Sequence, residues 1–128
     1  MNIHKKLSDW LFTTLSSVKG STAVVNGHSK VYPIVSKEEV EGAFIIYDSL
    51  EVVFAYTKDG ALLDAARARV LTVEKSYTAS ELLGDAVEAV LHNASVPTLG
   101  DVHVTSRKSV FDERTGEFVE EILIQIDL

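Results

Sequence analysis

Cysteine is absent from this chain of 128 residues, and proline occurs only twice. Without cysteine there is no disulfide framework and no thiolate ligand for a metal. The seven glycines stand singly, so the sequence has neither a glycine-rich dinucleotide loop nor a phosphate-binding loop. A G-x-S-x-G nucleophile motif is missing as well. The sequence therefore lacks the signatures of several large enzyme classes.

Grouped positive charge is also scarce. Lys and Arg number 12 against 19 Asp and Glu, which gives a formal net charge of −7. The nearest approach to a basic patch is Arg67, Arg69 and Lys75, and Glu74 interrupts it. Because gripping nucleic acid requires clustered Lys and Arg to neutralise phosphates, we expect no sequence-specific nucleic-acid binding.

Histidines and carboxylates form no recognisable metal-site pattern. No two of the four histidines stand four residues apart: they are His4, His28, His92 and His103. Zinc sites use such short spacings, although one of these histidines could still become a ligand once the chain folds. Carboxylates cluster at Glu38-Glu39-Glu41 and at Asp112-Glu113, in predicted loops where exposure to solvent explains them. We expect no bound metal and no other cofactor.

No long apolar run is present. No segment reaches the ~18 apolar residues that span a bilayer, and Met1–Lys6 is too polar to begin a signal peptide. With 46% hydrophobic and 24% charged residues, the composition is that of an ordinary globular domain. We therefore expect one intracellular domain without a membrane partner.

An amphipathic helix is predicted near the N-terminus, over Ile3–Lys19. Apolar residues recur on one face at helical intervals: Leu7, Trp10, Leu11, Leu15 and Val18. Phe12 lies beside this stripe and widens it. Gly20 follows, as a left-handed C-terminal cap requires. The simplest role for Trp10 is a core anchor, and a protein interface is the alternative.

The middle of the chain is predicted to be extended, in an antiparallel arrangement. Val31-Tyr32-Pro33 is biased toward extended conformation, because proline disfavours helix at the preceding residue. Ala43–Asp48 has the apolar, β-branched and aromatic composition of a central strand, and Leu50–Thr57 continues it. Lys58-Asp59-Gly60 is then predicted to be a turn. Ala66–Ser76 is predicted to be the next strand, although the residues before it have helical propensity.

A second amphipathic helix is predicted over Thr78–His92. Thr78-Ala79-Ser80-Glu81 has the form of a capping box, in which the Thr hydroxyl and the Glu carboxylate bind free backbone N–H groups. The apolar stripe consists of Leu82, Leu83, Ala86, Val87, Val90 and Leu91. Asn93 is suited to end the helix, and Pro97 prevents its continuation. So wide a stripe predicts that the helix covers a sheet.

A β-hairpin is predicted for the last third of the chain. Its strands are Val102–Phe111 and Phe118–Leu128, and its turn is Asp112–Gly116. Apolar residues alternate with polar ones along the second strand, which predicts one buried and one partly exposed face. Together these elements predict a single α+β domain over residues 1–128, with an antiparallel-rich sheet packed against both helices.

Two adjacent acids, Glu120 and Glu121, interrupt the final strand. Because neighbouring strand residues face opposite sides, one of them shares a face with Phe118 and Ile122. That residue marks either the point where the face leaves the core or a contact with a partner.

The order of these elements resembles the small tail-completion (tail terminator) proteins of long-tailed bacteriophages and prophages. Members begin with a helix and continue through a Val-Tyr-Pro segment, here Val31-Tyr32-Pro33, and an aromatic–aliphatic strand, here Ala43–Tyr47. Their second helix opens in the manner of Ser76–Leu82. Their last hairpin turns at an acidic Asp-x-x-Thr-Gly, here Asp112–Gly116. Gly42 is a departure, since the family has proline there.

That resemblance implies a structural protein with no enzymatic activity and no catalytic residues. It implies a homo-oligomeric ring, commonly of six subunits, that caps the tail tube and joins it to the head-side neck. The implied partners are further copies of the chain, the tail tube protein and head–tail connector proteins. The implied locations are the cytoplasm of the bacterial host during assembly and then the virion tail.

We place the contact residues of such a ring, by hypothesis, at two points. They are the turn of Lys58, Asp59 and Gly60 and the acidic pair of Glu120 and Glu121, since ring subunits meet through loops and sheet edges. An ordinary turn and an ordinary edge strand are the alternative explanation. Two other functions stay open: a small ligand-binding or enzymatic α+β domain with a pocket between helix and sheet, and a monomeric head–tail adaptor.

Overall fold

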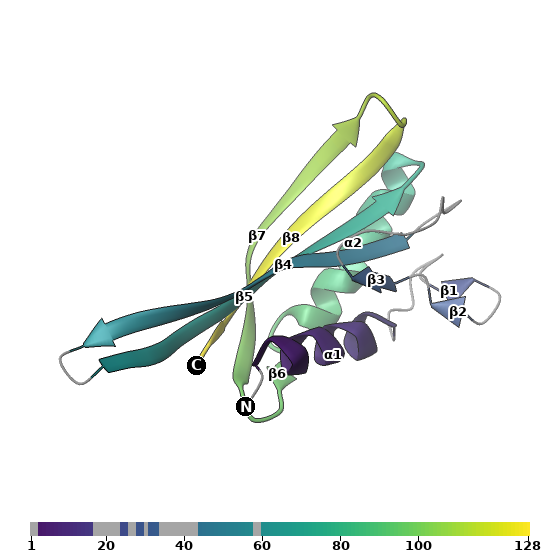
Figure 1. Ribbon diagram of the computed structural model, residues 1–128. Coiled ribbons are helices and arrows are strands. Elements are labelled where there is room, and N and C mark those ends of the chain that lie inside the picture. The colour runs from purple at the N-terminus through teal and green to yellow at the C-terminus, as the bar shows by residue number, and fades with distance from the viewer. Residues whose placement is uncertain (1–2, 17–23, 26–27, 30, 34–43, 58–59) are drawn as a thin grey trace.

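Two helices pack on one face of a six-stranded sheet in the computed structural model, which describes residues 3–16, 24–25, 28–29, 31–33, 44–57 and 60–128 (Figure 1). The helices are α1 (Ile3–Ser16) and α2 (Tyr77–Leu91). In spatial order, the strands are β3 (Val31–Pro33), β4 (Phe44–Thr57), β5 (Gly60–Glu74), β8 (Glu117–Asp127), β7 (Gly100–Asp112) and β6 (Ser95–Val96). A separate antiparallel pair consists of β1 (Val24–Val25) and β2 (His28–Ser29).

Antiparallel pairing dominates the six-stranded sheet. β4 pairs with β5, β5 with β8, β8 with β7 and β7 with β6, all antiparallel. The exception is β3, which runs parallel to β4 with Val31 opposite Ile45, so the antiparallel expectation was wrong for this pair. Parallel strands need a long connection, and the sequence leaves residues 34–43 between these two. The predicted α+β class, with an antiparallel-rich sheet and two helices, is confirmed.

The core lies between the helices and one face of the sheet. Its buried residues include Ile3, Leu7, Leu11 and Leu15 from α1, Leu83, Val87 and Leu91 from α2, and Ile122, Ile124 and Ile126 from β8. The helical members recur every three or four residues and the strand members every second residue, as the sequence predicted. Each such side chain stabilises the fold by roughly 1.5–3 kcal/mol when buried, so this layer holds both helices on the sheet.

Two apolar residues lie outside this core, contrary to expectation. Phe12 and Leu82 were both assigned to the apolar faces of their helices, yet they are 47% and 58% exposed. Each directly follows or precedes a buried leucine, and one residue turns a helix by about 100°, which is enough to carry a side chain off the buried face. Trp10 is half-buried and packs against the core, which agrees with a core role. The predicted C-terminal cap at Gly20 lies outside the described residues.

The N-cap of helix α2 lies two residues before the predicted one. Ser76, not Thr78, is the N-cap residue: its hydroxyl accepts a hydrogen bond from the backbone N–H of Ala79 over 3.1 Å. Thr78 lies inside the first turn and is exposed. The capping-box assignment was therefore wrong, because Ser76 already has the extended backbone that a cap residue needs. At the other end, Asn93 adopts a left-handed conformation with φ +61° and helps to end the helix.

Strand β4 is continuous where the sequence suggested two runs. Its register against β5 shifts between Asp48 and Glu51, so the residues that face the core change from odd to even numbers. Ile45 and Tyr47 are buried before the shift, and Leu50 and Val52 pack against the core after it. This register shift, a β-bulge, lets both halves of the long strand turn apolar side chains toward the same core.

The far end of β4 and β5 forms a projecting two-stranded ribbon. β8 pairs with β5 only from Ala65 to Glu74, whereas β4 and β5 remain paired further out, with Phe54–Tyr56 opposite Ala61–Leu63. We call these two segments the β4–β5 ribbon. It extends away from both helices, on the opposite side of the molecule from the tip of the β7–β8 hairpin (Figure 1).

Candidate functional site

Glu120 is a buried carboxylate at the centre of the candidate site. It shares the helix-facing side of β8 with Phe118 and Ile122, as strand alternation requires, and it is only 1% exposed. The hydroxyl of Ser109 donates a hydrogen bond to Oε1 over 2.7 Å, and Nε of Arg107 donates one to Oε2 over 3.2 Å. A buried carboxylate without such partners would cost several kcal/mol, so these bonds keep Glu120 in the core layer.

Arg107 extends from β7 toward α2 and meets four carboxylates. Its nearest guanidinium nitrogens lie 3.2 Å from Glu120, 2.7 Å from Asp85, 3.8 Å from Glu88 and 3.9 Å from Glu81. The three helical acids stand at i, i+4 and i+7, so one face of α2 presents all of them. Burial alone would lower the pKa of Arg107, but hydrogen bonds to Asp85 and Glu120 outweigh it and raise that pKa.

This cluster carries an excess of negative charge. Four carboxylates surround one guanidinium, which leaves three negative charges uncompensated within the cluster when every acid is ionised. A hydrogen bond with the Glu120 carboxylate, together with burial and repulsion from the same group, raises the pKa of Glu81 above its ordinary value. Shifts in this direction arise when two carboxylates share one site. A further cation beside Glu81 and Glu120 would therefore be stabilised.

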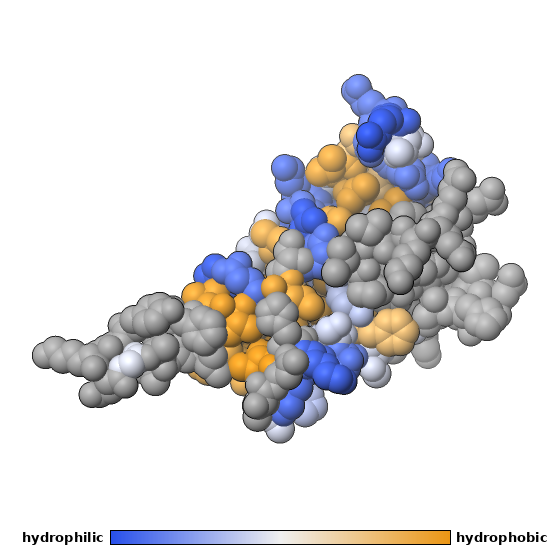
Figure 2. Space-filling view, in the orientation of Figure 1, coloured by the Kyte–Doolittle hydropathy of each residue, from blue (hydrophilic) through white to orange (hydrophobic). Residues whose placement is uncertain are grey.

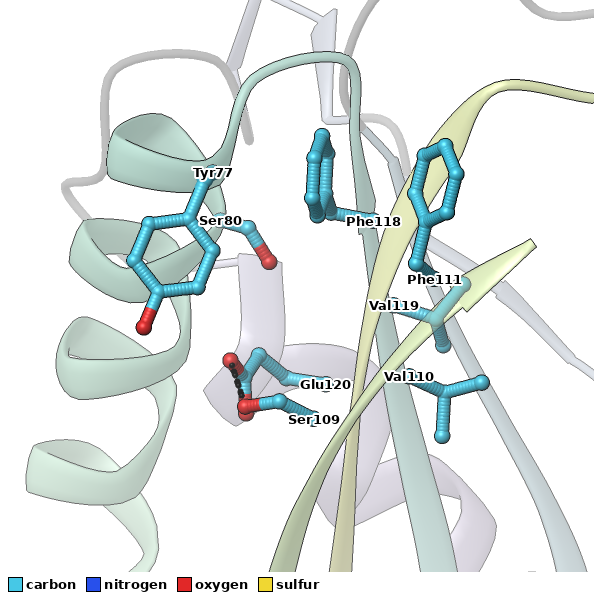
Figure 3. Close-up of a pocket in the computed structure, with 8 residues that line it drawn as sticks. All are labelled: Tyr77, Ser80, Ser109, Val110, Phe111, Phe118, Val119 and Glu120. Atoms are coloured by element: carbon cyan, nitrogen blue, oxygen red, sulfur yellow. Dashed lines mark hydrogen bonds between the residues drawn. The ribbon is translucent and has the colours of Figure 1, made fainter. Parts of the chain in front are cut away.

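A cavity of about 200 Å³ adjoins Glu120, between the first turn of α2 and the end of the β7–β8 hairpin (Figure 3). Its lining residues are Tyr77, Ser80, Ser109, Val110, Phe111, Phe118, Val119 and Glu120. The ring of Phe118 lies edge-on to Tyr77, with centroids 5.9 Å apart, and 4.8 Å from the ring of Phe111. Figure 3 shows the rings of Phe111 and Phe118 at one end of the cavity and the Glu120 carboxylate and Ser109 hydroxyl at the other, with the Ser80 hydroxyl between Tyr77 and Phe118. An apolar entrance thus leads to a polar floor.

The predicted contact turn is only partly described. Gly60 is the first residue of β5, with φ +119°, a conformation that side chains disfavour and glycine accepts. Lys58 and Asp59 lie outside the described residues. Gly60 pairs with Thr57, directly beyond the β4–β5 ribbon.

The predicted acidic pair is divided between the two faces of the sheet. Glu121 faces away from the helices, and its Oε2 lies 3.8 Å from Nη1 of Arg69. Arg69 also donates two hydrogen bonds of 2.7 Å to the carboxylate of Asp48. Glu120 and Glu121 therefore belong to different environments, and the structure does not bring either of them next to the turn at Gly60.

Sequence reasoning missed most of the cavity and its charge cluster. The missed residues are Tyr77, Glu81, Asp85, Arg107, Ser109 and Phe111. A signal was present, because the acids at i, i+4 and i+7 of the predicted helix form a charged stripe beside its apolar one. The pairing of that stripe with a residue of β7 depends on strand register, which the sequence pattern did not supply.

The described residues that line the cavity include no histidine. Across the residues that the structure describes, no group of His, Asp and Glu side chains is arranged to hold a metal ion. His103 lies at the surface, 3.7 Å from Asp127, and does not line the cavity. Neither of the two described helices is long and apolar enough to cross a membrane.

One comparison with known proteins gives a structural match. The fold is similar to that of a chain in a solved structure described as the virion of a native gene transfer agent particle. The similarity has a TM-score of 0.72 and covers 91% of this chain and 90% of that one, at 15% sequence identity. No protein-family model and no curated protein sequence matches the chain. At this identity the match shows the fold.

Proposed function

We propose that the protein is a structural component of a phage-like virion, and more specifically a tail-completion (tail terminator) protein. Several copies, commonly six in the family that the sequence resembles, form a closed ring that caps the tail tube and joins it to the head-side neck. Its partners are further copies of itself, the tail tube protein and head–tail connector proteins. It acts without catalysis, first in the bacterial cytoplasm and then in the virion tail.

The observation that carries this proposal is the β4–β5 ribbon. Two strands without a sheet beside them are marginally stable in water, yet the six residues of the ribbon are all apolar in sequence. Apolar strands with open edges are the elements through which chains associate, and monomeric proteins avoid them. In the proposed ring, a neighbouring subunit pairs with the open strand edges of the ribbon.

The ribbon projects from one end of the molecule. In the proposed ring it packs against a different surface of the next copy. Repetition of such a head-to-tail contact closes into a ring when the rotation between copies permits. The fold similarity to a chain of a gene transfer agent virion supports a place in a phage-like particle. The net charge of −7 suits a channel through which DNA slides without sticking.

The test compares assembly of the wild type with that of a ribbon variant. Light scattering coupled to size exclusion, over a wide concentration range and with and without tail tube protein, measures the mass of the complex. Negative-stain images then show whether it has a central hole. We expect a closed ring for the wild type and a monomer for Leu62→Lys/Leu63→Lys, because two adjacent lysines place charge on both faces of a strand.

The matched control is Phe12→Lys/Leu82→Lys, which makes the same change of charge at two exposed apolar residues of the helices. It should assemble as the wild type does. Circular dichroism melts establish that both double variants are folded. A wild-type protein that stays monomeric at every concentration and ignores tail tube protein would overturn the proposal, and so would a ring that survives charging of the ribbon.

A further inference from the structure

The aromatic end of the cavity is exposed to an unusual degree. Tyr77 is 60% and Phe111 51% exposed, and Phe118 joins them into one group of three rings. Val110 beside them is exposed as well. In Figure 2, apolar surface also lies below the polar tip of the β7–β8 hairpin, on the face turned to the viewer. Aromatic side chains gathered at the surface are characteristic of the centres of protein interfaces.

The cavity also has a polar lining. Ser80 is 2% exposed and its hydroxyl oxygen points into the cavity (Figure 3). Glu120 lies next to it with its two oxygens bound to Ser109 and Arg107. A carboxylate oxygen accepts more than one hydrogen bond, so Glu120 retains acceptor capacity toward the cavity.

The negative charge near the polar end of the cavity favours a positively charged ligand. The four carboxylates near Arg107 exceed its single positive charge. Glu81 adjoins the cavity through the lining residue Ser109, whose hydroxyl lies 3.5 Å from Glu81 Oε1 and 2.7 Å from Glu120 Oε1. A small divalent ion is disfavoured, because the described acids are arranged around a guanidinium and form no metal-binding group. An ammonium on a long apolar stem fits both ends, since the stem packs against aromatic rings while the charge reaches the carboxylates.

A partner protein with basic segments suits this acidic site better than a second copy of this chain, whose net charge is −7. A basic segment of another chain is drawn to this acidic surface. The cavity also lies at the opposite end of the molecule from the β4–β5 ribbon, so the two contacts do not compete.

We propose that the cavity between α2 and the β7–β8 hairpin is a docking site for a lysine side chain presented by a partner protein. The four-carbon stem of the lysine lies among Tyr77, Phe111 and Phe118. Its ammonium donates hydrogen bonds to Glu120, Glu81 and the hydroxyl of Ser80. This site goes beyond the ring proposed above and stands whether or not the ring forms.

The probe for this site is N-acetyl-lysine methylamide, and its matched control is N-acetyl-norleucine methylamide, which keeps the stem and lacks the ammonium. The ring signals of Tyr77, Phe111 and Phe118 are followed by NMR during each titration. We expect saturable shifts with the lysine probe, with a Kd on the order of 1–10 mM for so small a ligand. The norleucine probe should bind at least about fivefold more weakly. Addition of 0.5 M salt should weaken lysine binding, since salt screens partly exposed charge.

Two variants and one control locate the binding. Phe111→Ala removes part of the aromatic wall and Glu81→Gln removes one charge, and each should weaken lysine binding by about fivefold or more. Phe12→Ala also removes an exposed phenylalanine, but on α1 and far along the chain from the cavity, and should leave binding unchanged. Backbone NMR spectra show that each variant is folded, so a loss of binding reports on the site.

Three results would overturn the inference. One is the absence of saturable shifts with the lysine probe, and another is equal affinity for the norleucine probe, which would make the cavity a purely apolar groove. The third is a change of the same ring signals with protein concentration alone, which would mean that a second copy of this chain occupies the cavity. Failure of the ring test leaves these readouts unaffected, because they are measured on the aromatic signals of a single subunit.

Discussion

Gly84 and Arg107 fit so closely that helix α2 has no room for a side chain at residue 84. A Cβ atom there would lie 2.6 Å from Nη2 of Arg107 and 3.0 Å from Cγ of Glu120. The guanidinium has little freedom to retreat, because Asp85 and Glu120 both hold it. Glycine is normally about 1 kcal/mol worse than alanine inside a helix. Because Gly84 has no side chain, Arg107 can approach the buried Glu120 carboxylate and balance its charge.

Gly84→Ala should therefore destabilise the protein by about 1–3 kcal/mol, although alanine favours helix, because the added methyl group displaces the ion pair. Urea unfolding measures the change. In an Arg107→Ala background the same substitution should be neutral or stabilising by up to about 1 kcal/mol. An equal loss in both backgrounds would show that Arg107 is not the obstacle.

Leu82 and Leu83 are neighbours with opposite surroundings, being 58% and 0% exposed. Leu83→Ala should cost about 2–5 kcal/mol, since it removes a buried side chain and leaves a cavity beneath the helix. Leu82→Ala should change stability by less than about 0.5 kcal/mol. Both variants are compared by denaturant unfolding under the same conditions. Similar losses at the two residues would mean that a partner or a second copy covers the outer face of α2.

The start of α2 gives a similar paired test. Ser76→Ala removes the hydroxyl that accepts a hydrogen bond from Ala79, and should cost about 1 kcal/mol. Thr78→Ala changes an exposed residue of the first turn and should lie within about 0.5 kcal/mol of the wild type. Thermal and urea unfolding report both differences. A larger loss for Thr78 than for Ser76 would restore the capping box predicted from the sequence.

Glu81 should make stability depend on pH in a defined direction. Its pKa is raised by folding above the ordinary value of 4.5, so the folded protein binds this proton more tightly than the unfolded chain. The resulting stabilisation is complete below that ordinary pKa and is lost as the pH rises through the raised one. Relative to Glu81→Gln, the wild type should become less stable as the pH rises from 4.5 through the raised pKa of Glu81. Urea unfolding across this range measures the difference, and a wild type that gains on the variant with rising pH contradicts the assignment.

Periodicity was enough to predict most elements of the fold. Leu7, Leu11 and Leu15 repeat at helical spacing, and Ile122, Ile124 and Ile126 alternate, because each element buries one face against the same core. The ends of the elements were predicted less accurately, as the N-cap of α2 shows. Lone residues beside a stripe, such as Phe12 and Leu82, are assigned correctly only when the rotation of the helix on the sheet is known.

The candidate site depends on relations that no local pattern contains. Arg107 meets Glu120 because β7 and β8 pair in one register, and both meet Asp85 because α2 crosses them. Each of these charges has an ordinary explanation as a solvated residue when it is considered alone. The parallel pairing of β3 and the projection of the β4–β5 ribbon are likewise outcomes of strand order, which sequence spacing leaves open.

The central position of β8 also sets the order in which the protein can fold. β8 lies between β5 and β7, and its pairing with β5 joins residues as far apart in sequence as Ala65 and Asp127. During synthesis on a ribosome, β4 and β5 emerge long before β8. Until β8 has been made, the edge of β5 that pairs with it stays open. Such non-local pairing slows folding and prolongs the time during which strands can pair wrongly. The yield of native protein in a cell should therefore increase when β8 is synthesised faster. Chaperones that shield open β-edges should also increase this yield.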